Sequence, residues 1–368
     1  MDWPHIAPLL TAFALPLALS WVFTALHIRA AQDFGLIDLP SERKFHQKPT
    51  PTGAGAAIFA AVTLSALFLS TVCGLDWTTW NVQFLIGGLI VAFGLLDDHR
   101  MLAWQLRLLV QGLAALAAIR SIFNQAPWEP NLIGFAVWLV VMINAFNFVD
   151  NMDGLSAGIT LAIAACLAIA QGRLQDPFQS LPAYRNVGFN TWHLVMLMGA
   201  LTGFLWYNRP PARVFMGDAG STFLGFFLGL ASVPLFLDGE ETPRLSADWL
   251  APMCMFALPI YDLVSVATLR VWQQRGLFVS DRNNLSHRLV ALGMRPTRAV
   301  ALLWLLAVVG GVGGLLLYVV PTPAKMILGA AQLAGWWVAL PVAEYLAQRR
   351  LATLRRSVES RNASTKRR

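Results

Sequence analysis

Three acidic clusters interrupt a chain in which only 13% of the residues are charged. The first is Asp97-Asp98, the second lies within residues 144–155, and the third lies within residues 217–221. Each borders an apolar run long enough to cross a membrane. Carboxylates are costly at such positions and therefore indicate a functional site. Their predicted common purpose is to hold a divalent cation and act on a phosphate.

Asp97 and Asp98 close an apolar segment. A charge at bilayer depth costs about 2.5–3.5 kcal/mol even on the insertion scale, so both side chains should lie at the interface. Negative charge at a helix C-terminus opposes the helix dipole. A bound cation is therefore favoured over the alternative, a pair of solvated acids at a helix end.

Residues 144–155 combine amides and carboxylates beside an apolar run. Helical spacing places Asn144, Asn147 and either Asp150 or Asn151 on one face, and Asp153 follows one turn later. Such groups need partners or a ligand. Oxygen-rich groupings suit Mg²⁺ or Mn²⁺ better than a soft metal. A packed polar network between helices is the alternative.

Asp218 stands at the start of the next apolar helix, where free backbone N–H groups and the helix dipole favour an anion such as phosphate. Asp218 is predicted to be a metal ligand or a helix cap. Two basic segments accompany the acids. Residues 41–53, with Lys44, and residues 280–289, with His287 and Arg288, could contact phosphates or a sugar. For the first segment, charge that fixes membrane topology is an equally good explanation.

With 57% hydrophobic residues and 14 Trp, the chain is predicted to be an integral membrane protein. The predicted fold class is all-α and polytopic, with about eleven transmembrane helices and an active site at the cytoplasmic face. The expected spans lie near residues 6–27, 53–73, 81–97, 102–121, 131–149, 154–171, 191–207, 219–237, 249–271, 298–320 and 324–346.

Most of the 27 Lys and Arg residues fall in residues 28–52, near 100, in 208–218, in 272–296 and in the C-terminal tail. The positive-inside rule therefore places the N-terminus outside and the C-terminus, with all three acidic clusters, in the cytoplasm. Residues 1–348 would form the catalytic domain, and residues 349–368 a basic tail against anionic lipid. The net charge of +7 is spread over loops without a recognition module, which argues against nucleic acid as a partner.

Taken in order, Asp-Asp, Asn-x-x-Asp-x-x-Asp-Gly, Gly-Asp-x-Gly-Ser and a late His-Arg loop resemble the motifs of the polyprenyl-phosphate N-acetylhexosamine-1-phosphate transferases, glycosyl transferase family 4. The likeness spans roughly residues 38–290. Such enzymes transfer a sugar 1-phosphate from a UDP-sugar to a polyprenyl phosphate, commonly undecaprenyl phosphate in bacteria, with Mg²⁺ and release of UMP. The resemblance implies a bacterial plasma-membrane enzyme that initiates a cell-envelope polysaccharide, and it is compatible with a homodimer.

The resemblance also implies a role for each cluster. Asp218 would be the principal Mg²⁺ ligand and Asp98 a second ligand. Asp97 and Asp98 would lie beside the lipid phosphate, with one of the two as general base. The remaining residues would contact the donor, the metal or a phosphate: Lys44, Asn147, Asp150, Asp153, His287 and Arg288.

One departure concerns the donor. Many members carry His-x-His-His in the late loop, whereas this chain has Asn284-Leu285-Ser286-His287. The sugar therefore stays open, with UDP-N-acetylglucosamine as the default donor and another UDP-N-acetylhexosamine as the alternative. The run of histidines typical of the branch that uses UDP-N-acetylmuramoyl-pentapeptide is absent, which disfavours that donor.

Two other classes compete with the transferase. An ion-coupled transporter would also carry acids in membrane helices, but nearer to mid-membrane. A membrane phosphatase would need similar metal ligands and no lipid acceptor. Product analysis separates these classes.

Overall fold

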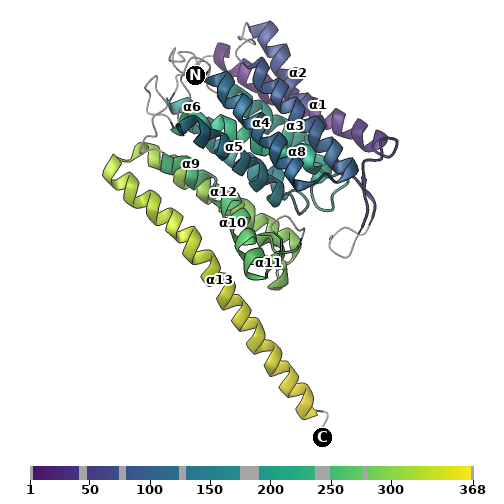
Figure 1. Cartoon of the computed structure of the whole chain (residues 1–368), viewed down its shortest axis with the longest axis vertical. Coiled ribbons are helices and arrows are strands. Elements are labelled where there is room, and N and C mark those ends of the chain that lie inside the picture. Colours follow the sequence, from purple (N-terminus) through teal and green to yellow (C-terminus); the bar gives the residue numbers. More distant parts are fainter. Residues whose placement is uncertain are drawn as a thin grey trace.

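Long apolar segments become helices because a helix satisfies every backbone N–H and C=O within one segment, which the bilayer interior requires. The computed structural model (Figure 1) describes residues 3–40, 48–73, 80–123, 130–174, 190–236, 249–276 and 281–365. Its α-helices are α1 (Trp3–Ala30), α2 (Gly55–Cys73), α3 (Asn81–Arg100), α4 (Trp104–Ile122), α5 (Pro130–Val149), α6 (Leu155–Leu174), α7 (Thr191–Asn208), α8 (Gly217–Ser232), α9 (Leu250–Met255), α10 (Ala257–Trp272), α11 (Leu285–Ala291), α12 (Pro296–Leu316) and α13 (Thr322–Thr365). Short 3-10 helices, η3 (Val233–Phe236) and η5 (Leu317–Val319), follow α8 and α12.

Within the described ranges, nine helices are long and apolar enough to cross a membrane. The chain is a nearly all-helical, polytopic membrane protein. The predicted spans 191–207 and 249–271 are helical but are not among those nine. The count of eleven spans therefore stays a prediction.

The segment 249–271 is not the single helix that the sequence analysis predicted. It forms α9 and α10, with a break at Phe256. Pro259 lies in the first turn of α10 and has no N–H to donate to a preceding carbonyl. Proline is tolerated in a first turn and not in a helix interior, so it separates the two helices.

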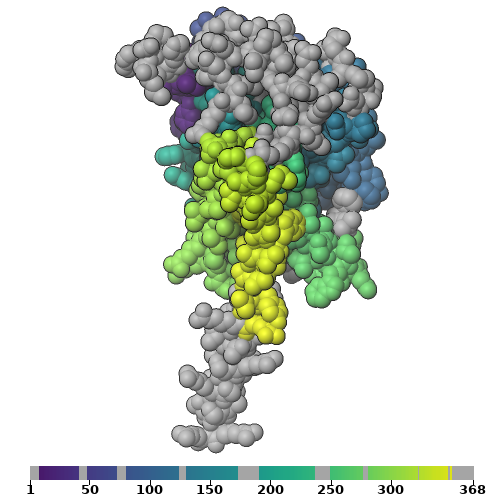
Figure 2. All heavy atoms as spheres, turned by 90° about the vertical axis from the view of Figure 1, so that its left-hand side faces the viewer, coloured from purple at the N-terminus to yellow at the C-terminus, as the bar shows by residue number. Residues whose placement is uncertain are grey.

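The last helix, α13, runs without interruption from Thr322 to Thr365. The predicted boundary between residues 348 and 349 falls inside this helix, and the separate basic tail stays a prediction. Figure 1 shows the C-terminal part of α13 leaving the bundle beyond α11, and Figure 2 shows α13 lying along the outside of the bundle. It packs against α9, α10 and α12.

A small two-stranded sheet connects the segment after α1 with the segment before α2. β1 (Ile37–Asp38) pairs antiparallel with β2 (Thr50–Pro51). The Phe215 N–H donates to the Pro51 carbonyl at 2.8 Å, and the Gly55 N–H donates to the Met216 carbonyl at 2.9 Å. The start of α2 is thereby fixed against the start of α8.

The centre of the bundle is α8, which is buried from Ala219 to Ser232. It packs mainly against α3 and α5. Glycines permit a close approach at its first turn: a Cβ on Gly94 of α3 would lie 2.5 Å from the Ala219 Cα, and a Cβ on Gly55 would overlap Gly220. The backbones of α2, α3 and α8 therefore meet almost directly.

Substituting Gly94 tests this close approach. In an ordinary helix interior Gly→Ala stabilises by roughly 0.5–1 kcal/mol. At Gly94 the added methyl group meets the α8 backbone, so we expect Gly94→Ala to lower the free energy of unfolding by about 1–3 kcal/mol. The measurement is the melting temperature of the purified protein in detergent.

Gly112→Ala is the matched control, because Gly112 also lies in a membrane helix and a Cβ there would meet nothing within 4 Å. It should keep or raise the melting temperature. Equal melting temperatures for the two variants would contradict the packing argument.

Candidate active site

The three acidic clusters meet at one end of the bundle. Asp97 and Asp98 lie in the last turn of α3, Asp150 directly follows α5, and Asp218 lies in the first turn of α8. These helix ends converge because α8 packs between α3 and α5. The structure thus brings together segments that lie up to 121 residues apart in the sequence.

The carboxylate of Asp98 closes the N-terminus of α8. Its Oδ1 accepts the Asp218 N–H at 2.9 Å, and its Oδ2 accepts the Ala219 N–H at 3.2 Å. These are two of the N–H groups that a helix start leaves without an intrahelical partner. Gly217, with φ at +70°, allows the approach, since a Cβ there would collide with this carboxylate. Asp98 therefore caps a neighbouring helix, and its predicted role as metal ligand stays a prediction.

Asp218 is held from two sides. Its Oδ1 accepts the Asn147 side-chain amide at 2.6 Å, and its Oδ2 lies 3.4 Å from an Arg107 Nη. The Asn147 amide also contacts the Ser221 hydroxyl at 3.1 Å. Asn147 thus joins the end of α5 to the first turn of α8, and its predicted contact with the metal or the donor stays a prediction.

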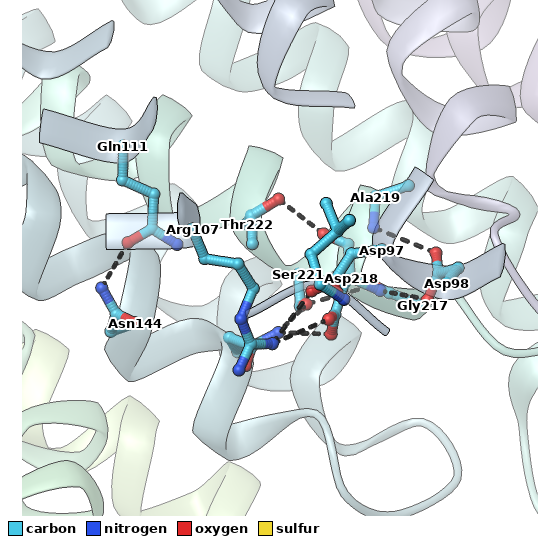
Figure 3. Close-up of polar contacts among 12 residues, drawn as sticks. Asp97, Asp98, Arg107, Gln111, Asn144, Gly217, Asp218, Ala219, Ser221 and Thr222 are labelled. Atoms are coloured by element: carbon cyan, nitrogen blue, oxygen red, sulfur yellow. Dashed lines mark hydrogen bonds and ion pairs between the residues drawn. The ribbon is translucent and has the colours of Figure 1, made fainter. Parts of the chain in front are cut away.

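Arg107, in the first turns of α4, is a site residue that the sequence analysis missed (Figure 3). Its Nη1 lies 2.9 Å from Asp97 Oδ2 and 3.4 Å from Asp218 Oδ2. Asp97 also accepts the Leu102 N–H at 2.6 Å. The available signal was an arginine in the first turn of a largely apolar span, because ionisable residues in such spans usually mark function.

One turn further along α4, Gln111 continues the polar contact with α5. Its Oε1 accepts the Asn144 side-chain amide at 2.7 Å (Figure 3). The same amide donates to the Val140 carbonyl. Asn144, which the helical spacing placed beside Asn147, therefore belongs to a packed polar pair between helices. The alternative of a polar network is correct for this residue.

Asp150 adds a third carboxyl group to the neighbourhood of Asp98 and Asp218. Burial raises its pKa well above the ordinary value, and the negative charges of Asp218 and Asp98 raise it further. These acids repel one another, and the charge of Arg107 offsets them in part. An added cation would lower the energy of this group of acids.

The carboxylates present fit a magnesium ion that is bound only partly by the protein and partly by the substrate. Among the described residues, no three His, Cys, Asp or Glu side chains form a cluster that could hold a metal by itself. Mg²⁺ is commonly bound by one or two carboxylates and by substrate phosphates, with water completing its shell. Asp218, which is about one-third exposed, and Asp150 or Asp98 beside it could supply those carboxylates.

Asp153 and Gly154 hold the loop that precedes α8. Asp153 Oδ2 accepts the Ala212 N–H at 2.8 Å, and the Gly154 N–H donates to Asn208 Oδ1 at 3.0 Å. Asn208 in turn donates to the Val214 carbonyl at 2.8 Å. In this structure Asp153 therefore supports the loop, and its predicted contact with the nucleotide stays a prediction.

The late loop contains α11, which carries His287. Asp262 of α10 caps this helix as Asp98 caps α8: Oδ1 accepts the Leu285 N–H at 2.6 Å, and Oδ2 accepts the Asn284 amide at 3.1 Å. The Asn284 amide also donates to the Phe148 carbonyl at 2.8 Å. Through this contact α11 is attached to the end of α5.

Arg288 is turned toward α10 and α13. Its guanidinium lies 3.0 Å from Glu344 Oε2 and donates to the Ser265 hydroxyl at 2.9 Å and to the Asn283 carbonyl at 2.8 Å. These contacts do not bring Arg288 to the acids around Asp218. Its predicted contact with the donor stays a prediction, and so does that of Lys44, which lies outside the described residues.

His287 is nearly buried beside the charged residues Arg282 and Asp281. Burial, with the nearby Arg282, lowers the pKa of His287 to about 4, although Asp281 acts in the opposite direction. The imidazole is therefore neutral at neutral pH. A neutral imidazole can donate one hydrogen bond and accept another, which suits a sugar hydroxyl or amide better than a bare phosphate charge.

Comparison with known proteins relates the chain to enzymes that act on polyprenyl phosphates. A Bacillus subtilis (strain 168) protein named "Probable undecaprenyl-phosphate N-acetylglucosaminyl 1-phosphate transferase" is 27% identical over 84% of this chain and 85% of its own length. A decaprenyl-phosphate N-acetylglucosaminephosphotransferase of Mycolicibacterium smegmatis is 28% identical, over 81% of this chain and 79% of its own length. Residues 80–235 match the family model of glycosyl transferase family 4. The chain is therefore similar to glycosyl transferase family 4.

The part of the chain that matches the family model runs from α3 to η3. It contains the three acidic clusters and Arg107. A further relative, the undecaprenyl-phosphate alpha-N-acetylglucosaminyl 1-phosphate transferase of Yersinia pestis, is 26% identical over 82% of this chain and 83% of its own length. The resemblance found in the motifs is thus confirmed at the level of the family.

The lowered pKa of His287 predicts how stability depends on pH. The unfolded chain takes up a proton on His287 near its ordinary pKa of 6.5, but the folded protein does so only near 4. Unfolding is therefore favoured increasingly as the pH falls from 6.5 to 4, and this contribution is constant below that range. The measurement is the melting temperature of the wild type and of His287→Asn across this range. We expect a smaller decline in the variant, and parallel curves would contradict the assignment.

Proposed function

We propose that the protein transfers N-acetylglucosamine 1-phosphate from UDP-N-acetylglucosamine to undecaprenyl phosphate or a related polyprenyl phosphate, and releases UMP. The observation that carries this proposal is the convergence of Asp97, Asp98, Asn147 and Asp218 beside Arg107 at three helix ends. Relatives named as transferases of this kind support the choice of acceptor and sugar.

The transfer is a phosphoryl substitution. A phosphate oxygen of the lipid attacks the phosphorus that carries the sugar, a new P–O bond forms, and the bond to the UMP oxygen breaks. UMP leaves with that electron pair, and the lipid gains a diphosphate-linked sugar. We favour a single displacement, and a covalent aspartyl-phosphate intermediate is the alternative.

The acceptor needs alignment more than activation. A phosphate monoester has a second pKa of about 6, so the lipid phosphate is already mostly ionised near neutral pH. Both acids already bind protein groups: Asp97 accepts from Arg107, and Asp98 accepts from the first turn of α8. We propose that positioning is their principal contribution, with proton removal by one of them as the secondary possibility.

Arg107 is the proposed cationic partner of the reacting phosphates. Its Nη1 faces Asp97 and Asp218, and its side chain is about one-third exposed. A guanidinium presents five N–H donors in a planar fork that matches phosphate oxygens. Arg107 could therefore hold the acids and a phosphate at the same time.

Mg²⁺ is the proposed cofactor, with Mn²⁺ as a substitute. Asp218, with Asp98 or Asp150, would hold the ion, which when bound would neutralise charge on the donor diphosphate. The proposed donor contacts are those of Lys44, Asn147, Asp153 and His287, with Arg288 supporting the loop. The proposed setting is the bacterial plasma membrane, with the N-terminus outside and the site at the cytoplasmic face.

The test supplies purified protein with undecaprenyl phosphate and a panel of UDP-sugars, and follows UMP together with the lipid-linked product. We expect UMP release that requires both the lipid and Mg²⁺, with UDP-N-acetylglucosamine as the preferred donor. Chelation by EDTA should abolish release, and added Mg²⁺ should restore it. Asp218→Asn should lower kcat by at least about 10², the range for losing one electrostatic contact in a transition state.

Asp33→Asn is the matched control, because Asp33 is an exposed acid in a turn outside the site, and its rate should stay within about twofold of the wild type. Lipid-independent release of phosphate would instead indicate a phosphatase. Ion flux without any lipid-linked product would indicate a transporter. Either result would reject the proposed function.

Arg107 gives an independent prediction. Arg107→Gln keeps the side chain polar but removes the charge that offsets Asp97 and Asp218, so kcat should fall by about 10²–10³. Arg120→Gln is the control, because Arg120 lies at the other end of α4 and donates to the Phe123 carbonyl. Both rates are measured on samples with matched melting temperatures. An unchanged rate for Arg107→Gln would remove Arg107 from the mechanism.

A further inference from the structure

A polar network, buried on the α10 and α11 side and half-buried on the α5 side, joins the end of α5 to α11 and α10. It consists of Phe148, Asn151, Asp262, Asn284 and Ser286, and is here named the α5–α11 clasp. The Ser286 hydroxyl donates a hydrogen bond to Asn151 Oδ1. The Asn151 amide donates to the Phe148 carbonyl at 2.6 Å, and the Asn284 amide donates to that same carbonyl at 2.8 Å.

The clasp is closed on the α10 side by Asp262, which accepts from both Asn284 and the Leu285 N–H. Asn284, Ser286 and Asp262 are 6%, 1% and 4% exposed, so little water can replace these bonds. A buried polar network of this kind rigidifies a structure only when its members have partners. The clasp therefore fixes the register of α11 against the end of α5.

Two ion pairs also hold α11 and the segment that precedes it. Arg288 pairs with Glu344 of α13, and Arg270 pairs with Asp281 at 3.0 Å. The Arg270 guanidinium also lies over the Phe148 ring, 4.9 Å from its centre. α11 thus packs against α12 and bonds to α10 and α13, and the clasp connects it to the end of α5.

The composition of the clasp bears on the departure found in the sequence. Positions 284 and 286, where a His-x-His-His pattern would place imidazoles, carry an amide and a hydroxyl that bond within the protein. The Asn284 amide donates a hydrogen bond to the Phe148 carbonyl, and the Ser286 hydroxyl donates to Asn151. Of the three histidine positions in that pattern, only 287 carries a histidine in this chain. His287 directly follows Ser286 in α11, so the bond that holds Ser286 also fixes the position of His287.

We propose that Asn151 and Ser286 are positioning residues for the nucleotide-sugar donor, which act by holding α11 and His287 in register with the α5 end of the site. The inference rests on the proposed transferase function and extends it to donor recognition. Asn151 lies one residue after Asp150 in the same turn that leads from α5, so a shift of α11 changes the distance between His287 and the acids.

The acceptor should be less affected, because its proposed contacts lie on another helix. Asp97 and Asp98, which are proposed to position the lipid phosphate, lie in the last turn of α3. α11 instead packs against α12 and bonds to α10. Weakening the clasp should therefore raise the KM for the nucleotide-sugar donor without raising the KM for the lipid.

The experiment compares Ser286→Ala, Asn151→Ala and the double variant in the intact protein, with UDP-N-acetylglucosamine and undecaprenyl phosphate each varied in turn. Loss of one hydrogen bond should raise the KM for the donor about 3- to 10-fold and leave the KM for the lipid within about twofold. The double variant should be no worse than the poorer single variant, because both changes remove the same bond. Ser286→Thr keeps the hydroxyl and should retain the donor KM.

Thr268→Ala is the matched control, because the Thr268 hydroxyl bonds within α10, to the Val264 carbonyl, and connects no second element. Hydrogen exchange of the amides of residues 285–291 provides a readout without turnover, and should be faster in Ser286→Ala and Asn151→Ala than in the control. An unchanged donor KM, an equal rise in both KM values, or additive effects in the double variant would overturn the inference. A wild type that gives no lipid-dependent UMP release would reject the proposed function itself.

Discussion

The buried start of α8 is the constraint on which the site depends. A helix N-terminus carries N–H groups without intrahelical partners, and burying them without an acceptor is costly. Asp98 supplies that acceptor from α3, through the N–H groups of Asp218 and Ala219. The contact requires backbones to approach closely, which explains glycine at positions 94 and 217. The position of Asp218 is therefore a consequence of how three helices pack.

This packing gathers negative charge that the protein itself balances only in part. Asp97 and Asp218 share the guanidinium of Arg107, while Asp98 and Asp150 lie nearby. Such a group of acids is unfavourable in the free protein, and it becomes favourable when a cation and the phosphates of a substrate are added together. The arrangement is typical of sites that neutralise charge during phosphoryl transfer.

An aspartate of one helix caps the N-terminus of another helix at two places in the structure. Asp98 caps α8 from α3, and Asp262 caps α11 from α10. Both capped helices connect to the end of α5, the first through Asn147 and the second through Phe148. The end of α5 thus links the acidic cluster to the helix that carries the late-loop histidine, so each side of the site can be positioned relative to the other.

The sequence by itself determined the helical class and the residues that lie at helix ends, because apolar length and the cost of a charge in lipid are local properties. Asp97, Asp98 and Asp218 were recognisable for that reason. Tertiary structure alone decided the partners: Arg107 bridges two of these acids, and Arg288 turns to α13. Which helix faces meet depends on packing among segments far apart in the chain, and no local pattern encodes it.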